Sequence, residues 1–305
     1  MMSQNIKTLL RSARRRYWHE PQLRAAAMRA DAVLVSFPKS GRTWLRYLLS
    51  CYLAELAELG FQPDLATTFR VLPNFDRSPH RGVEGFVGKR PNLPLILVSH
   101  LPFDERLFLD RPVIFLVRDP RDVIVSAYFH ATRHKRVFDG PVGAFLDDPT
   151  YGLPALISFT NGWAGALTTR RHLVRSYEAL HSDTEEAVTG ILHFLGVSVD
   201  DGALERAIAL AQFDRMRKRE QEQGIPDHEY DRADAQSLRM RSGKAQAFGD
   251  VLSPTEADHV LEACARGLTA HGRALLAATG VDLEDHGMLP RMEFQGEALC
   301  ASAPS

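Results

Sequence analysis

The short polar stretch from Lys39 to Thr43 is suited to binding a phosphate group. It follows an apolar run at 32–37 and precedes a segment with apolar residues at helical spacing, so a strand leads through a tight turn into a helix. Gly41 permits the turn, and the first N–H groups of the helix converge at its positive dipole end. Lys39 adds a full positive charge. The stretch therefore predicts a site for a phosphate-bearing ligand.

This stretch differs from the common nucleotide-binding loop, Gly-x-x-x-x-Gly-Lys-Ser/Thr. Residues 36–43 keep the second glycine and the final threonine, but Ser36 replaces the first glycine and Arg42 replaces the lysine. Lys39 lies instead within the turn, where it would meet the terminal group of a ligand from the side. We identify no strongly apolar run that ends in the lone aspartate which helps to hold magnesium. We therefore expect phosphate chemistry that requires no metal.

Other apolar runs are also followed by side chains that could accept a proton or bind an anion. His100 closes one run, and its neutral imidazole could accept a proton near pH 7, although a single histidine is more often structural. Arg118 closes another, and Ser126 lies on the helix after it, so both could reach a second anionic group.

The elements that position these residues form an α/β pattern. Apolar runs at 32–37, 95–98, 113–117 and 173–177 alternate with helical patterns, which predicts a central parallel sheet flanked by helices on both faces. Ligands of such sheets bind beyond the carboxyl ends of the strands. Polar residues follow each run at that edge, so we expect them to share one site.

Four segments resemble the sulfotransferases that use 3′-phosphoadenosine 5′-phosphosulfate (PAPS). Residues 37–44 resemble the 5′-phosphosulfate loop of that family, and residues 115–126 resemble its 3′-phosphate motif. Residues 99–102 are similar to the segment with its catalytic histidine, and residues 241–244 with 249–250 to its late Arg-x-Gly loop. The resemblance covers residues 33 to about 255 and implies a P-loop-like three-layer sandwich.

The resemblance also implies roles for individual residues. Lys39 would stabilise charge on the leaving phosphate, His100 would be the base, and Ser126 would belong to the catalytic group. PAPS, as a co-substrate that needs no metal, would bind Lys39, Ser40, Gly41, Arg42, Thr43, Trp44, Arg118, Ser126, Tyr177, Arg241, Ser242 and Gly243. The family often has a lysine two residues before the histidine. Val98 occupies that position here, so any role of that lysine is absent or met by another residue.

We therefore expect a PAPS-dependent sulfotransferase. It would move a sulfuryl group to a hydroxyl, or less readily an amine, of a small molecule, lipid or saccharide, and release adenosine 3′,5′-bisphosphate (PAP). One alternative is a small-molecule kinase or nucleoside triphosphatase with a degenerate loop, disfavoured by the absent Gly-Lys-Thr and magnesium carboxylate. Another is a catalytically silent nucleotide-binding or scaffolding protein, disfavoured because both Lys39 and His100 are present.

Length and composition favour one sizeable domain. The chain has 305 residues, of which 45% are hydrophobic. We expect a basic N-terminal extension at 1–30, a sulfotransferase domain at 31–289 and a flexible tail at 290–305. The net charge of −1 argues against general nucleic-acid binding.

The compartment is predicted from cysteines and hydropathy. Cys51, Cys264 and Cys300 are too few and too scattered for a disulfide framework or a zinc site, which favours a reducing, cytoplasmic location. No apolar run is long enough to span a membrane, and no secretory signal is evident. Basic residues between Lys7 and Arg16 could touch an anionic surface, although a solvated extension is the simpler interpretation.

Three long connections are expected to shape the acceptor pocket, at 61–94, 132–154 and 213–240. The third is dense in charge between 213 and 239, which indicates a mobile segment or lid. After it, residues 254–280 are predicted to form two helices, with Ser253 as the first cap. The C-terminal dimer motif of many cytosolic relatives is not evident, so a homodimer of that kind is not expected.

Overall fold

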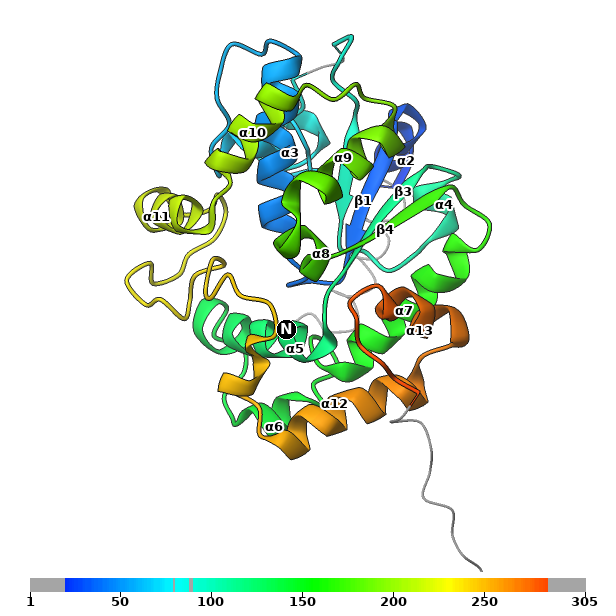
Figure 1. Ribbon diagram of the computed structural model, residues 1–305, viewed down its shortest axis with the longest axis vertical. Coiled ribbons are helices and arrows are strands. Elements are labelled where there is room, and N and C mark those ends of the chain that lie inside the picture. The colour runs from blue at the N-terminus through cyan, green and yellow to red at the C-terminus, as the bar shows by residue number, and fades with distance from the viewer. Residues whose placement is uncertain (1–19, 79, 88–89, 285–305) are drawn as a thin grey trace, which may run out of the picture.

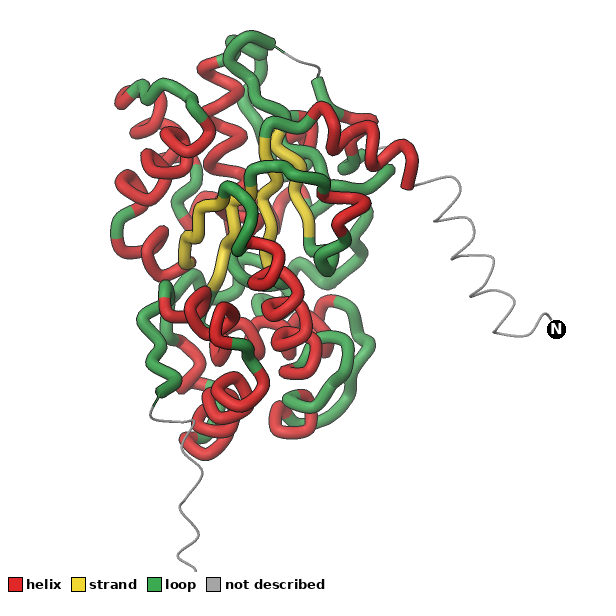
Figure 2. Tube along the Cα trace, turned by 90° about the vertical axis from the view of Figure 1, so that its right-hand side faces the viewer, coloured by secondary structure: helices red, strands yellow, loops and turns green. Residues whose placement is uncertain are grey.

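A four-stranded parallel sheet lies between helices at the centre of the computed structural model, which describes residues 20–78, 80–87 and 90–284 (Figure 1, Figure 2). Its strands are β1 (Ala32–Ser36), β2 (Ile96–Ser99), β3 (Val113–Val117) and β4 (His172–Ser176). Their order is β2-β1-β3-β4. The predicted strands are confirmed to within one residue at each end. The strands β1, β2 and β3 are buried at every position, which explains why their sequences are continuous apolar runs.

Side chains of the strands alternate between two separate hydrophobic cores. Leu34, which aligns with Val98 and Ile114 in neighbouring strands, points into one core. Val33, which aligns with Leu97 and Val113, points into the other. Because both faces are covered, the predicted three-layer sandwich with a central parallel sheet is confirmed.

Different helices cover the two faces of the sheet. The core on the Leu34 face includes residues of α3 (Arg42–Leu56), α8 (Tyr177–Ser182), α9 (Thr184–Leu195), α10 (Asp201–Leu210) and α11 (Phe213–Gln223). The core on the Val33 face includes residues of α2 (Glu20–Arg29), α4 (Glu105–Phe108), α5 (Pro120–Phe129), α6 (Val142–Phe145), α7 (Leu153–Leu167), α12 (Pro254–Gly267) and α13 (Ala270–Ala277). Short connections include the 3₁₀ helices η2 (Thr67–Arg70), η3 (Val83–Gly85) and η5 (Ala247–Asp250), and the π-helical turn η4 (His130–His134).

Local sequence signals fix where several helices begin. Asp119 caps α5 by accepting a hydrogen bond from the Arg121 N–H, and Pro120 occupies the first helical position. Ser253 caps α12 in a reciprocal capping box with Glu256. The two helices predicted within 254–280 are confirmed as α12 and α13.

Two segments are more ordered than the sequence pattern indicated. The charged region 213–239 begins with the helix α11, because Phe213, Met216 and Glu220 recur on one face and Met216 and Glu220 are buried. Residues 20–29, predicted as part of an extension, form α2, whose Ala26 and Ala27 pack into the core. The basic residues from Lys7 to Arg16, the tail 290–305 and Cys300 lie outside the described residues.

Cysteine pairing and membrane crossing can be examined in the described part of the chain. Cys51 and Cys264 are buried free thiols. Among the described residues, no helix combines the length and apolar character needed to cross a membrane. The predicted cytoplasmic location stays a prediction.

Candidate active site

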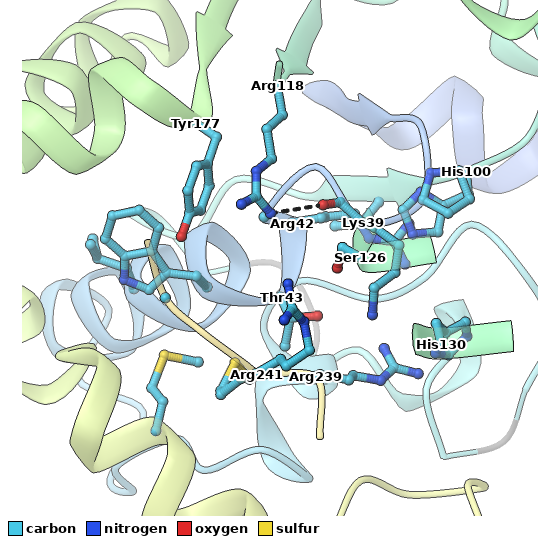
Figure 3. A pocket seen from close by; sticks show the side chains of 18 of the residues that line it. Lys39, Arg42, Thr43, His100, Arg118, Ser126, His130, Tyr177, Arg239 and Arg241 are labelled. Carbon is cyan, nitrogen blue, oxygen red and sulfur yellow. Dashed lines mark hydrogen bonds between the residues drawn. The ribbon is translucent and has the colours of Figure 1, made fainter. Parts of the chain in front are cut away.

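A cavity of about 660 Å³ lies at the carboxyl ends of the strands. Every residue predicted for the site lines it except Ser40, whose hydroxyl donates instead to the Phe37 carbonyl at 3.0 Å. Ser40 therefore holds the turn through its side chain. The convergence of strand ends, α3, α5 and a late loop brings together residues more than two hundred positions apart in the sequence (Figure 3).

The turn between β1 and α3 requires two left-handed backbone positions. Lys39 has φ of 75° and Gly41 has φ of 91°, a region that glycine tolerates and lysine rarely adopts. A Cβ atom at Gly41 would overlap Cδ2 of Tyr177, so only glycine fits between the turn and that ring. The first turn of α3 holds no acidic residue, which leaves its N–H groups and dipole available to an anion.

Arg118 is held at the end of β3 by several contacts. Its Nη1 donates to the Lys39 carbonyl at 3.4 Å, and its Nη2 donates to Asp122 Oδ2 and the Lys244 carbonyl, each at 3.0 Å. The guanidinium lies over the Tyr177 ring at 4.1 Å from its centroid. The Nε of Arg118 is buried and has no hydrogen-bond partner among the described residues. The Nε–H therefore remains available to a ligand.

Aromatic rings line the part of the cavity beside Arg118. Trp44 and Tyr177 meet edge to face with centroids 5.7 Å apart, and Trp44 Nε1 donates to the Ala211 carbonyl at 2.9 Å. His181 Nε2 donates to the Gly243 carbonyl at 2.9 Å. These contacts fix flat ring surfaces in the wall of the cavity beside Arg118.

The late loop closes this region from the other side. Gly243 has φ of 66°, and a Cβ there would overlap Cδ2 of Phe213, so the loop needs glycine for both conformation and space. Arg241 lies over the Phe129 ring at 4.5 Å from its centroid, and its buried Nε has no partner among the described residues. Ser242 also lines the cavity.

Lys39 extends into a part of the cavity that disfavours its charge. Burial and the nearby Arg239 guanidinium, with smaller contributions from other charges, lower the pKa of Lys39 to about 7. Burial and the neighbouring charges of Arg46 and Arg239 similarly lower the pKa of Arg42. An anion bound in this part of the cavity would therefore stabilise the charged forms of both side chains.

His100 is fixed in one tautomer at the end of β2. Its Nδ1–H donates to the Ser36 carbonyl at 2.7 Å, which leaves the Nε2 lone pair free to accept a proton. Burial and the charge of Arg42 lower the pKa of His100 well below its usual range, so the imidazole is neutral at pH 7. Val98, where the family often has lysine, also lines the cavity.

Among the cavity residues that were not anticipated from the sequence, His130 and Arg239 carry buried polar atoms. His130 lies one helical turn beyond Ser126, and Arg239 lies two positions before Arg241, yet neither belongs to a recognised motif. His130 Nδ1 and Arg239 Nε are both buried without partners in the described part of the chain. For His130 the available signal was its spacing of four from Ser126, which places both side chains on one face of a helix. Arg239 lies in a loop, where spacing carries no such signal.

Metal-binding groups do not gather in the described part of the chain. Among residues 20–78, 80–87 and 90–284, no three His, Cys, Asp or Glu side chains are arranged to hold an ion.

Comparisons with known proteins identify relatives of this chain. The family model for the sulfotransferase domain matches residues 29–272. The 3-alpha-hydroxysteroid sulfotransferase of Cavia porcellus is 29% identical over 204 residues, which cover 62% of this chain and 67% of that protein. Sulfotransferase 2A1 of Homo sapiens is 27% identical over 201 residues with the same coverage.

Solved structures share the fold. Mouse sulfotransferase SULT7A1 complexed with PAP has a TM-score of 0.57 at 20% identity, with 82% of this chain and 90% of that chain covered. Retinol dehydratase in complex with androsterone and PAP has a TM-score of 0.56 at 18% identity, with coverage of 84% and 83%.

Proposed function

Since this chain belongs to the sulfotransferase family, we propose that its cavity binds PAPS and that Lys39 and His100 promote transfer of the sulfuryl group to an acceptor hydroxyl. The observation that carries the proposal is the set of anion-binding groups that line one cavity. Arg118 and Arg241 each have a buried Nε without a partner among the described residues, and the α3 N-terminus with Lys39 lines the same cavity. A nucleotide that carries several anionic groups fits this set of donors.

The residues present fit such a nucleotide. Arg118 Nε and Arg241 Nε offer charge-assisted hydrogen bonds to a 3′-phosphate. Trp44 and Tyr177 offer ring surfaces to an adenine base. The N–H groups at the start of α3, with Arg42 and Thr43, offer donors to the 5′-phosphosulfate.

PAPS supplies the sulfuryl group when bound, and this chain supplies the proton transfer and charge stabilisation. His100 Nε2 accepts the hydroxyl proton as the acceptor oxygen bonds to sulfur. Lys39 donates a hydrogen bond to the phosphate oxygen as its bond to sulfur breaks. Ser126 lines the cavity beside Lys39 and adds a hydroxyl donor to the same region (Figure 3).

The acceptor is proposed to be a small molecule that carries a hydroxyl group. The names of the relatives include a 3-alpha-hydroxysteroid as the substrate of one of them, which supports a hydroxylated small molecule as the acceptor class. The part of the cavity available to it is bordered by His100, His130, Arg81, Arg239 and His228.

Calorimetric titration of the purified protein with PAP and, separately, with ATP would test the donor assignment. EDTA is included so that metal-dependent binding cannot contribute. Tight binding of PAP with weak binding of ATP supports the proposal, because Arg118 and Arg241 recognise a 3′-phosphate that ATP lacks. Arg118→Ala should weaken PAP binding by at least about tenfold. A preference for ATP would contradict the sulfotransferase assignment and favour a kinase.

A further inference from the structure

Cations outnumber carboxylates among the residues that line the cavity. Seven Lys and Arg side chains line it among the described residues, against the single carboxylate of Asp76. PAPS carries about four negative charges at neutral pH. Lys39, Arg42, Arg118 and Arg241 are the cations that the proposed function assigns to it. Arg81, Lys135 and Arg239 remain.

Of these three, Arg239 is the one that combines a buried, unpartnered Nε with the absence of an ion pair among the described residues. Arg81 forms an ion pair with Asp227 at 3.0 Å, and Lys135 is exposed to solvent. Arg239 forms no ion pair in the described part of the chain. The carboxylate that favours the charged form of Arg239 is Glu220, which opposes the lowering of its pKa by burial. Glu220 is buried and already accepts backbone hydrogen bonds from Arg239 and Met240.

A chain of neutral histidines orients the Arg239 guanidinium. Arg239 Nη2 and Arg81 Nη1 both donate to His228 Nε2, at 2.7 and 3.0 Å. His228 Nδ1 must then donate to His134 Nε2 at 3.2 Å, and His134 Nδ1 to the Ser237 carbonyl at 2.9 Å. Burial and neighbouring cations lower the pKa values of His228 and His134, which keeps both rings neutral. The network holds the guanidinium in place without cancelling its charge.

The free donors of Arg239 point to the region beside the reacting groups. Figure 3 shows Lys39, Arg239 and His130 directed toward the same part of the cavity, away from Tyr177. Arg239 Nε and His130 Nδ1 are buried and unpartnered among the described residues. Leaving charged and polar donors buried and unsatisfied is costly, so a ligand that supplies acceptor oxygens there would gain most.

We propose that the acceptor carries an anionic group, a carboxylate or a phosphate, in addition to its hydroxyl, and that Arg239 binds this group with His130 beside it. The inference rests on the proposed function, because the hydroxyl must lie near His100 while the anion reaches Arg239. A neutral steroid would leave the buried Nε of Arg239 without a hydrogen-bond partner. An anionic acceptor supplies that partner, and we expect the site to select for it.

The test measures anion binding to protein saturated with PAP, so that the donor site is already filled. The probes are three pairs matched for shape: 4-hydroxybenzoate with 4-cresol, glucuronate with glucose, and glycerol 3-phosphate with glycerol. We expect the anion of at least one pair to bind at least about tenfold more tightly than its neutral partner. The carboxylate and phosphate pairs distinguish the two anionic groups.

Variants separate the role of Arg239 from general charge and from folding. Arg239→Met should abolish the anion preference, and Arg239→Lys should retain part of it. Arg215→Met is the matched control, because Arg215 is an exposed cation on α11 that does not line the cavity. It should bind the anion as the wild type does. Thermal melting confirms that each variant is folded.

The outcomes distinguish this inference from the proposed function. If the wild type does not bind PAP, the proposed function fails. If PAP binds but no anion is preferred over its neutral partner, the anionic acceptor is ruled out. If Arg239→Met weakens PAP binding as much as anion binding, Arg239 belongs to the donor site and the inference is overturned.

Discussion

At the scale of single residues, Lys39 combines an unusual backbone conformation with an unusual pKa. Its φ of 75° places the side chain in the cavity, where burial and Arg239 lower its pKa to about 7. A phosphate beside the amine reverses these effects, because an opposite charge favours the protonated form. Lys39 should therefore become fully charged when the donor binds, before it donates the hydrogen bond that we propose to the leaving oxygen.

Proton uptake on PAP binding would reveal this change. At about pH 8 the amine of Lys39 is mostly neutral in the free protein, because its pKa is about 7. The phosphates of PAP should raise this pKa, so that the amine takes up a proton from the buffer when PAP binds. At about pH 6 the amine is already protonated, so its uptake should vanish. Titrations in buffers of different ionisation enthalpy measure the uptake. Lys39→Met should remove the component at pH 8, and equal heats in all buffers would contradict the prediction.

His100 should affect turnover far more than donor binding. Its Nε2 is the free ring nitrogen, so His100→Ala removes the proposed base while the donor contacts remain. We expect kcat to fall by about 10² to 10⁴ and the Kd for PAP to change little. His193→Ala, at an exposed position of α9, is the matched control and should leave both values unchanged. Retained turnover in His100→Ala would show that another group accepts the proton.

Much of the proposed donor site, but little of the proposed acceptor site, could be predicted at this scale. Lys39, His100 and Arg118 follow apolar runs, and the physics of parallel sheets brings such positions to one edge. His130 and Arg239 have no comparable signal, because their charges become unusual only through burial and neighbours that the sequence does not place together. Ser40 lay within the motif, but its hydroxyl is used inside the turn.

At the scale of elements, the β1 to α3 connection depends on contact with α8. Tyr177 begins α8, and its ring fills the space that a side chain at position 41 would need. The turn at Gly41 therefore packs directly against the Tyr177 ring that lines the cavity. The sequence pattern predicted β1 and α3. It did not predict that the turn between them would pack against Tyr177, which follows β4.

A pair of glycine variants isolates this contact. Gly41 and Gly60 both have positive φ, of 91° and 75°, but a methyl group at Gly41 would meet the Tyr177 ring, whereas one at Gly60 would have no neighbour within 4 Å. Gly60→Ala should cost about 1 kcal/mol of unfolding free energy from backbone strain alone. Gly41→Ala should cost about 2 to 4 kcal/mol and weaken PAP binding. Chemical denaturation measures both, and equal losses would contradict the role of Tyr177.

At the scale of the whole molecule, Glu220 ties the late loop to the helical layer. Its Oε1 accepts from Tyr230 Oη at 2.9 Å and from the Arg239 N–H at 2.8 Å, and its Oε2 accepts from the Met240 N–H at 2.9 Å. The carboxylate is fully buried in α11. The loop that bears Arg239 and Arg241 is thus anchored to the layer that covers the Leu34 face of the sheet.

Removing this anchor should loosen the loop without unfolding the sheet. Glu220→Ala leaves two buried N–H groups unpaired and should cost about 2 to 4 kcal/mol. Hydrogen exchange should then speed up across residues 230–243, and PAP should bind more weakly. Glu222→Ala, an exposed neighbour on α11, should change neither. Unchanged exchange in the Glu220 variant would show that the loop is held by other contacts.

The layered architecture was predictable because it depends on hydrophobic pattern, whereas the cavity walls depend on contacts between distant connections. The runs of β1 and β3 are apolar throughout, so their burial on two faces followed directly. The segment of Arg81, the η4 turn and the segment of His228 meet through charged and histidine side chains. Such polar contacts have no periodicity that the sequence could reveal. The strand order β2-β1-β3-β4 was not predicted either.

The proposed position of adenine on Trp44 has an optical consequence. The chain has three tryptophans, of which Trp163 is fully buried in the core and Trp18 lies outside the described residues. Trp44 lines the cavity, and its indole N–H donates to the Ala211 carbonyl. We expect an adenine that stacks on Trp44, as proposed, to alter its fluorescence emission. Donor affinity could then be followed in solution without labels.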